Sequence, residues 1–224
     1  MSVVTGPEVP DTDPRTAAVT FVTTEHFTLQ GARAATIAES TSRAAMFLSA
    51  VSGGLVALGL IATATRAATA FYAFGLVILP TLAFVGVVTF ERALQTGIED
   101  HGYGRRIARL RAYYFDYAPE LATYLQSVEP RDRLAIQGLR AGWWQDYRTV
   151  AGMVAVITAV LTGSAAALIA ALASGHSLAV ALAVGVPAGV ITLALLMRYQ
   201  QGTWQREGAA HLHAFDEASR GPVR

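Results

Sequence analysis

The sequence predicts an all-α membrane protein with four transmembrane helices, arranged as two tandem units of a helix followed by a helical hairpin. Three observations predict this fold class. The hydrophobic fraction is 53% and the charged fraction only 15% in 224 residues, whereas soluble domains average about 25% charged residues. The apolar residues gather into long uncharged stretches. Finally, adding 107 to a residue number carries Gln30 to Gln137 and Pro80 to Pro187 without a gap.

Four uncharged stretches predict the membrane spans at residues 44–65, 67–90, 149–174 and 177–197. Each holds at least about 20 residues, enough at about 1.5 Å of rise per residue to cross a hydrocarbon core of about 30 Å. Buried helices of an Ala-rich soluble protein are the alternative, but they do not need such lengths. Only short linkers at Arg66 and at residues 174–177 join the spans, so each pair is expected to form an antiparallel hairpin.

The repeat divides the chain into unit 23–128 and unit 129–219, with tails at 1–22 and 220–224. Both units cross the membrane twice in the same direction, which predicts a parallel repeat about an axis along the membrane normal. The repeated motif has two interpretations: a gating contact between the units, or a packing motif retained after duplication. Its residues are Gln30, Gly31, Arg33 and Glu39, and then Gln137, Gly138, Arg140 and Asp146. In both interpretations Arg33 is matched with Glu39 and Arg140 with Asp146.

Polar segments flank the spans. Residues 1–22 are rich in Pro, Asp and Thr and are expected to lack regular structure. A cytoplasmic helix is predicted from Thr24, the expected N-cap, with Glu39 and Arg43 paired four residues apart. Further cytoplasmic helices are predicted over 91–128, over 130–148 and after Arg198.

Residue types within and beside the spans predict how the helices pack. Small residues recur every four positions on the first, third and fourth spans, so helices can approach closely there, and a homo-oligomer is expected. The packing positions are Ser49, Gly53, Ala159, Gly163, Gly185 and Gly189. Pro80 and Pro187 are expected to kink their helices. Trp143 and Trp144 precede the third span as interfacial anchors.

Orientation follows from the arginines. All 17 basic residues are arginine, and among the segments between spans the two short turns hold only Arg66. The positive-inside rule therefore places both termini and the central loop in the cytoplasm. A GC-rich coding sequence explains the absence of lysine and is consistent with a bacterial inner membrane. Residues 1–24 lack the apolar core of a signal peptide, so the first span is expected to act as the insertion signal.

Candidate binding groups are few. The arginines 105, 106, 109 and 111 form either an anionic-lipid or phosphate contact or a solvated helix face balanced by Glu99, Asp100 and Asp116. Ser and Thr in the spans either bond to their own backbone or line a water or ion path. His211 and His213 are two residues apart and lack a carboxylate or cysteine cluster, so no metal is expected.

The sequence has no cysteine, no lysine and no carboxylate pair in a span. We therefore expect no enzymatic activity, no cofactor and no nucleic-acid partner. The expected partners are the lipid bilayer, a second copy of the chain, and a cytoplasmic protein or anionic lipid.

Two parts of the chain stand out by their residues: Thr24 to Gln30 through Ala35 to Ser40, with Arg43, Phe47 and Leu48 after them, and Arg105 to Arg109 with Tyr113 to Leu121. With these stretches the chain resembles multi-pass membrane proteins of uncharacterised function that are common in actinobacteria. The resemblance implies four membrane spans and no particular activity. A looser likeness, in layout only, is to the two-span effector domains of bacterial conflict systems, which are thought to disrupt membranes. The leading functional prediction is an oligomeric channel or pore gated through its cytoplasmic helices. The alternative is a non-conducting scaffold or signalling protein that presents those helices to a partner.

Overall fold

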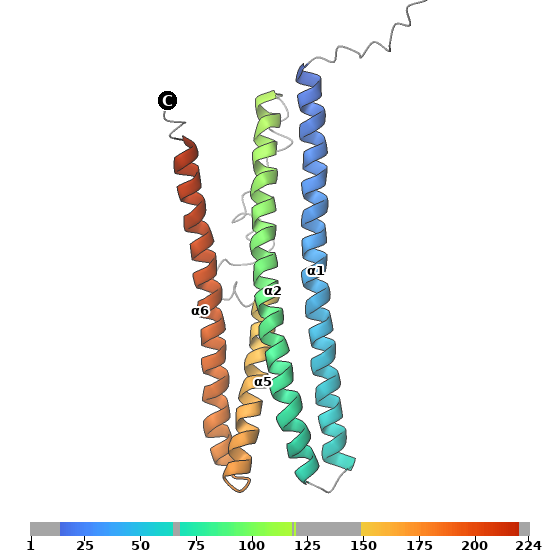
Figure 1. The fold of residues 1–224 in the computed structure, drawn as a ribbon, viewed down its shortest axis with the longest axis vertical. Coiled ribbons are helices and arrows are strands. Elements are labelled where there is room, and N and C mark those ends of the chain that lie inside the picture. The colour runs from blue at the N-terminus through green and yellow to red at the C-terminus, as the bar shows by residue number, and fades with distance from the viewer. Residues whose placement is uncertain (1–13, 65–67, 118, 120–148, 220–224) are drawn as a thin grey trace, which may run out of the picture. The chain divides into compact units, whose positions relative to one another are not determined.

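The computed structural model describes residues 14–64, 68–117, 119 and 149–219, and they fold into four α-helices (Figure 1). The helices are α1 (Pro14–Ala64), α2 (Ala68–Tyr117), α5 (Val150–Ala173) and α6 (Leu178–Ser219). The described part contains no β-strand. The all-α prediction is confirmed, and each predicted span lies within one of these helices apart from the few span-end residues at the turns.

All four helices are long and apolar enough to cross a membrane, which suggests a multi-pass membrane protein. α5 has 24 residues, or about 36 Å of helix, close to one bilayer crossing. α1 has 51 residues and α2 has 50, or about 75 Å each. Because the hydrocarbon core is only about 30 Å thick, each of these two helices must continue well beyond it.

One predicted boundary needs correction. α1 begins at Pro14, so residues 14–22 are helical, and Thr24 does not cap the helix. Instead its hydroxyl donates to the carbonyl of Thr20, one turn earlier. α2 runs without a break from the second span into the polar segment that follows it, as predicted, and α1 likewise joins its polar segment to the first span. No Gly, Pro or other helix breaker stands at either junction, and the i to i+4 backbone hydrogen bonds therefore propagate.

The chain divides into two packing units, which we name by their content. The span unit comprises Thr36–Glu99 and Val128–Arg224, and the polar unit comprises Met1–Ala35 and Asp100–Ser127. These units differ from the two predicted repeats, and the repeat stays a prediction. Three predicted segments lie outside the described residues: the helix at 130–148, residues 120–128, and the extreme tails.

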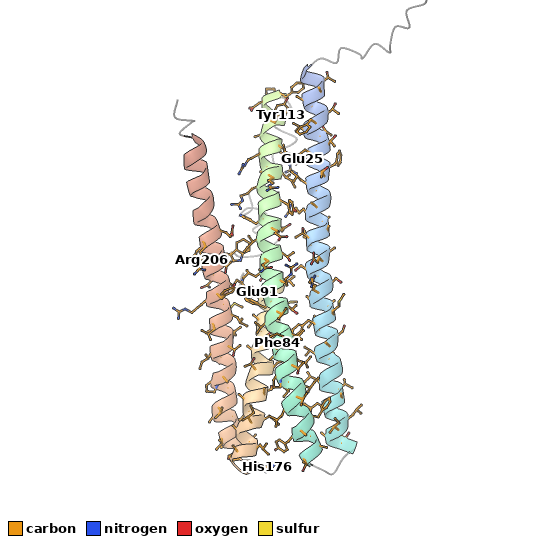
Figure 2. All side chains as sticks on the ribbon, in the orientation of Figure 1. Glu25, Phe84, Glu91, Tyr113, His176 and Arg206 are labelled. Carbon is orange, nitrogen blue, oxygen red and sulfur yellow. The ribbon has the colours of Figure 1, made fainter. Side chains whose placement is uncertain are left out.

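The span unit is held by an apolar core that draws on all four helices. Phe47 of α1, Leu82 and Phe90 of α2, Val154 of α5 and Met197 of α6 are each at most 6% exposed. Long apolar side chains such as Phe84 cover the outside of the same unit (Figure 2). An apolar inside with an apolar outside is the pattern of a helix bundle that faces lipid.

Local chemistry explains the α5–α6 hairpin. The Thr149 hydroxyl accepts a hydrogen bond from the Gly152 amide at 2.9 Å and caps α5. At the other end, Gly175 and His176 have φ angles of 66° and 73°, and the His176 amide donates to the Ala171 carbonyl at 2.7 Å. This left-handed pair reverses the chain within a few residues. α6 continues unbroken through Pro187, as α2 does through Pro80.

Aromatic rings join the two hairpins of the span unit. Tyr72 of α2 meets His176 in the α5–α6 turn edge to face, with ring centroids 5.0 Å apart (Figure 2 labels His176). Further along these helices, Phe90 of α2 lies 6.5 Å from the ring of Tyr199 on α6. Such pairs add about 0.5–1.5 kcal/mol beyond the area that they bury.

Candidate functional site

Helices α5 and α6 of the span unit pack in close contact. A Cβ placed on Gly163 would meet the Gly185 carbonyl oxygen at 2.8 Å and the Gly189 Cα at 3.2 Å. A Cβ on Gly185 would in turn lie 2.6 Å from the Ala167 Cβ. The two backbones therefore touch, and four predicted packing residues, Ala159, Gly163, Gly185 and Gly189, meet at this crossing. Small residues at four-residue spacing are the usual basis of such contacts in membranes.

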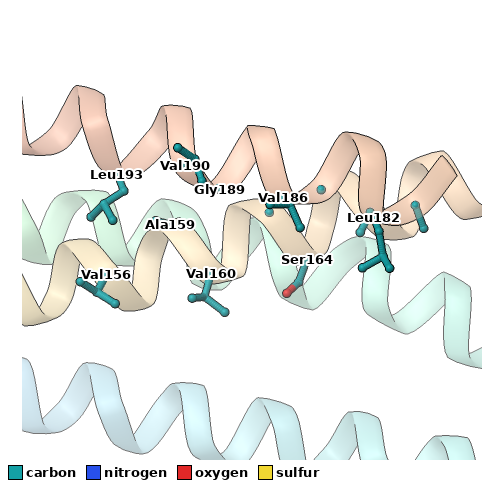
Figure 3. A pocket seen from close by; sticks show the side chains of 13 residues that line it. Val156, Ala159, Val160, Ser164, Leu182, Val186, Gly189, Val190 and Leu193 are labelled. Atoms are coloured by element: carbon teal, nitrogen blue, oxygen red, sulfur yellow. The ribbon is translucent and has the colours of Figure 1, made fainter. Parts of the chain in front are cut away.

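An open groove of about 370 Å³ runs along the same crossing (Figure 3). The glycines form its floor, and Val160, Val186 and Leu193 are among the larger side chains that wall it. Ser164 is the one polar side chain on the lining. The groove lies within the apolar part of two candidate spans.

Helices α1, α2 and α5 also meet closely. A Cβ on Gly86 would lie 3.0 Å from the ring edge of Phe47 and would overlap the Thr158 hydroxyl. The Thr158 side chain is fully buried, and its hydroxyl donates to the Val154 carbonyl at 2.7 Å. Thr81, Thr89, Thr162 and Thr192 donate to their own helix backbones in the same way. The interpretation that span hydroxyls satisfy themselves locally is therefore confirmed for these threonines.

The small-residue face of α1 is different. Ser49 and Gly53 are exposed, and a Cβ on Gly53 would meet nothing within 4 Å. Neither Ser49 nor Ser52 has a hydrogen-bond partner within the described part of the chain. Within the described part of one copy, therefore, no other helix contacts Gly53, and Ser49 has no hydrogen-bond partner.

An ion-pair group lies just before the first uncharged stretch. Glu39 accepts a hydrogen bond from Arg43 at 2.9 Å on α1 and contacts Arg92 of α2 at 3.4 Å. The hydrogen bond and positive charge of Arg43, aided by Arg92, lower the pKa of the Glu39 carboxyl. The predicted Glu39–Arg43 pair is therefore confirmed, and Arg92 is an additional partner.

In the polar unit, Arg33 pairs with Asp100 of α2 and not with Glu39. Its Nε lies 2.6 Å from one carboxylate oxygen, and its Nη2 lies 3.2 Å from the other. The hydrogen bond that Arg33 donates to the Asp100 carboxylate raises the pKa of Arg33. The predicted match of Arg33 with Glu39 is wrong because residues six apart on a helix point to different sides. Leu29 and Ile107 are buried in the same unit.

The remaining motif residues of the first copy are accounted for individually. The Gln30 amide and the Nε2 of His26 are 2.8 Å apart, one turn apart on α1. Gly31 is exposed with nothing within 4 Å of a built Cβ, so no helix of the described chain touches it. The second copy of the motif and the interfacial anchors lie outside the described residues. They are Gln137, Gly138, Arg140 and Asp146, and Trp143 and Trp144.

The arginine group of α2 has no acidic partner in the part of the chain that the structure describes. Arg106 and Arg109 are exposed, and Arg105 and Arg111 are half-buried. None of the four forms an ion pair or hydrogen bond with another side chain that the structure describes. Asp100, one of the three carboxylates expected to balance them, is already held by Arg33. Arg105 and Arg109 are four residues apart, a like-charge spacing that weakens a helix by about 0.2–0.5 kcal/mol.

The sequence contained a signal for the Arg33–Asp100 pair that local motif reasoning missed. Arg33 precedes Arg66 by 33 residues, and Asp100 follows Arg66 by 34. Glu39 and Arg92 lie 27 before and 26 after the same turn. Antiparallel helices joined by a tight turn bring equidistant residues together, because both rise by about 1.5 Å per residue.

Among the residues that the structure describes, no three His, Asp or Glu side chains gather as metal ligands would. The side chains of His211 and His213 lie outside the described part. Comparison of the chain with protein-family models, with curated proteins and with solved structures gave no match.

Proposed function

We propose that this protein is a non-conducting membrane scaffold that presents charged helical segments to an anionic partner. The observation that carries the proposal is the filled interior of the span unit. Phe47, Phe90 and Val154 are at most 2% exposed, and the buried Thr158 hydroxyl is occupied by its own helix. An ion crossing such a core would lose its hydration without gaining ligands, a cost of several kcal/mol at least.

The polar unit supplies the surface for the partner. Its four arginines, which have no acidic partner among the described residues, offer charge and planar hydrogen-bond donors that suit carboxylate or phosphate groups. The unit is reached from the spans through the continuous helices α1 and α2.

Reconstitution into liposomes tests the scaffold proposal. We expect no potassium or chloride efflux above that of protein-free liposomes, with or without an applied voltage. From native membranes, cross-linking should recover a partner at fixed stoichiometry with the wild-type protein and lose it with the variant Arg106→Glu/Arg109→Glu. Arg198→Glu, an exposed arginine of α6, is the matched control and should retain the partner. Robust efflux, or equal recovery by all three proteins, would contradict the proposal.

A channel is the second candidate, and the open face of α1 favours it. Ser49 and Ser52 expose hydroxyls that have no partner among the described residues, beside the open surface at Gly53. Several copies that pack through α1 would surround a path lined by these hydroxyls. Efflux that rises with protein density and disappears with Gly53→Leu would support this candidate over the scaffold.

We also infer that the two hairpins form a parallel internal repeat, with α1 equivalent to α5 and α2 to α6. Gly97 and Trp204 are 107 residues apart, and a Cβ on Gly97 would lie 3.7 Å from the Trp204 ring. Symmetry-related residues touch only beside their axis, so this contact supports a pseudo-twofold axis. Buried residues also recur at this interval: Ala44 and Ala151, Phe47 and Val154, Val51 and Thr158, and Phe90 and Met197. Independent halves cut between residues 119 and 149 should co-purify when co-expressed.

The expected setting is a bacterial inner membrane with both termini in the cytoplasm, as the arginine distribution indicates. The actinobacterial resemblance stays a prediction and adds no activity to the proposal.

A further inference from the structure

The helices of the polar unit carry an excess of positive charge. Residues 14–35 and 100–117 contain six arginines and three carboxylates, a net charge of +3 with histidine neutral. The Arg33–Asp100 ion pair occupies one charge of each sign. The excess is concentrated on α2, in the arginine group at 105, 106, 109 and 111, which forms no ion pair within the described chain.

Three of these arginines share one side of α2. Arg105 and Arg106 precede Arg109 by four and three residues, spacings that bring side chains together on a helix. We call these three residues the arginine face. Arg106 and Arg109 are exposed, and so is Ala112, three residues after Arg109 on the same side. The arginine face is therefore open to an anion.

The chain before α1 has the opposite charge. Residues 1–13, which lie outside the described part, contain no basic residue and three carboxylates. The carboxylates are Glu8, Asp11 and Asp13. This acidic segment joins the polar unit directly at Pro14, where α1 begins. Residues 120–127 of the same unit hold only one carboxylate. The acidic segment is thus the complementary part of the unit.

The length of the acidic segment is sufficient to reach the arginine face. The contact of Arg33 with Asp100 sets the antiparallel register of the unit and puts Arg109 level with Thr24, ten residues along α1 from Pro14. That is about 15 Å of helix, and the step between packed helix axes is about 10 Å. Glu8 lies six residues before Pro14, so an extended chain carries it about 20 Å. The two side chains span the remaining distance.

We propose that residues 1–13 dock on the arginine face, with Glu8 and Asp11 as its intramolecular anions, and that they compete there with the anionic partner. The inference rests on the proposed function, in which this face binds the partner. Each exposed ion pair is weak. However, a tethered anion has an effective concentration on the order of millimolar, so weak pairs occupy the face for much of the time. The partner binds only the fraction of molecules whose face is open, which lowers its apparent affinity.

Disulfide trapping in the full chain tests the docking without any partner. The chain has no cysteine, so Val9→Cys/Ala112→Cys introduces a single pair, with one thiol in the acidic segment and the other beside the arginine face. The matched control is Val9→Cys/Phe21→Cys, because Phe21 is an exposed residue of α1 level with Ala112. Under mild oxidation in detergent, the monomer of the first variant should form its disulfide several-fold faster than that of the control.

The origin of this preference is tested with charge and salt. Arg106→Glu/Arg109→Glu, added to the first cysteine pair, should abolish the difference in rate, and so should salt at about 1 M, which screens exposed charges. Equal rates for the two cysteine pairs, or a difference that survives both treatments, would overturn the docking.

Anion binding tests the competition. The probe is a fluorescent octa-aspartate peptide, titrated by anisotropy with the purified chain in neutral detergent. Glu8→Gln/Asp11→Asn should bind it about two- to fivefold more tightly than the wild type does. The control Asp216→Asn/Glu217→Gln removes the same charge from the other end of the chain and should leave the affinity unchanged.

The outcomes separate this inference from the proposed function. Equal affinities of the wild type and Glu8→Gln/Asp11→Asn, or an equal gain in the control, would overturn the competition. If neither the wild type nor Glu8→Gln/Asp11→Asn binds the probe, the proposed function is contradicted, while selective disulfide trapping would still support the docking.

Discussion

At the scale of single residues, two glycines show that the neighbouring helix decides whether the absence of a Cβ atom matters for packing. Gly163 lies against the backbone of α6, whereas Gly53 faces open space. Both occupy predicted packing positions, and their sequence surroundings are similar. The side chain that each position tolerates therefore depends on the facing helix and not on the local sequence.

Gly163→Ala should destabilise the protein, and Gly53→Ala should not. The new Cβ at 163 meets a carbonyl oxygen at 2.8 Å, which only separation of α5 and α6 can relieve. Overpacking of this kind costs about 1–3 kcal/mol, more than the roughly 0.5–1 kcal/mol that alanine contributes to helix stability. Thermal unfolding in detergent, followed by circular dichroism, should show a lower midpoint for the first variant only. Equal midpoints would mean that the two helices do not touch here.

The Glu39 ion pairs predict a specific pH dependence. Because the folded-state pKa of Glu39 is lowered, its stabilising contribution is complete above the ordinary glutamate pKa and is lost as pH falls through the lowered value. The unfolding midpoint of the wild type should therefore exceed that of Glu39→Gln at neutral pH, with the gap closing below about pH 4. Glu91→Gln serves as the control, since Glu91 has no ion pair in the described part of the chain. A gap that is independent of pH would rule out an electrostatic origin.

At the scale of elements, α1 ends at Ala64 and α2 begins at Ala68, so only three residues join these two antiparallel helices. Because both helices are continuous, residues at equal sequence distances from residue 66 lie opposite one another. Within the span unit this rule pairs Glu39 with Arg92, and within the polar unit it pairs Arg33 with Asp100. A local motif search cannot detect either pair, because the partners are 53 and 67 residues apart.

A double-mutant cycle measures the Arg33–Asp100 pair. Arg33 is 44% exposed and Asp100 is 27% exposed, so solvent screens the interaction. We expect a coupling free energy of about 0.5–1 kcal/mol from Arg33→Ala, Asp100→Ala and the double variant. Hydrogen exchange of residues 14–35 should accelerate in both single variants, and the exchanged-charge variant Arg33→Asp/Asp100→Arg should restore protection. Strictly additive effects would show that the two side chains do not interact.

At the scale of the whole molecule, four apolar helices imply a defined topology. A reporter that is active only in the cytoplasm should work when fused after Arg224, and a periplasmic reporter should work when inserted at Gly175 in the α5–α6 turn. The reason is the arginine distribution, which favours retention of the arginine-bearing segments on the inner side. The reverse reporter activities would show that the topology is opposite to the predicted one. Extraction of the protein without detergent would contradict the assignment to a membrane.

The all-helical class and the four spans were predictable because both follow from the chain itself. Long uncharged stretches such as residues 67–90 need helical hydrogen bonding inside a bilayer, whatever their neighbours are. The start of α1 was less predictable, since Pro14 suits the first turn of a helix as well as a tail. Propensity alone does not distinguish these cases.

The amino-acid sequence by itself determined that this chain is helical and apolar enough for a membrane, because hydropathy and helix length are properties of a single segment. Only the tertiary structure decided that Gly163 touches Gly185, that Ser49 and Gly53 stay uncovered, and that Arg33 meets Asp100. These outcomes depend on which faces of different helices meet. That choice is made by packing between residues far apart in the chain, and no local pattern encodes it.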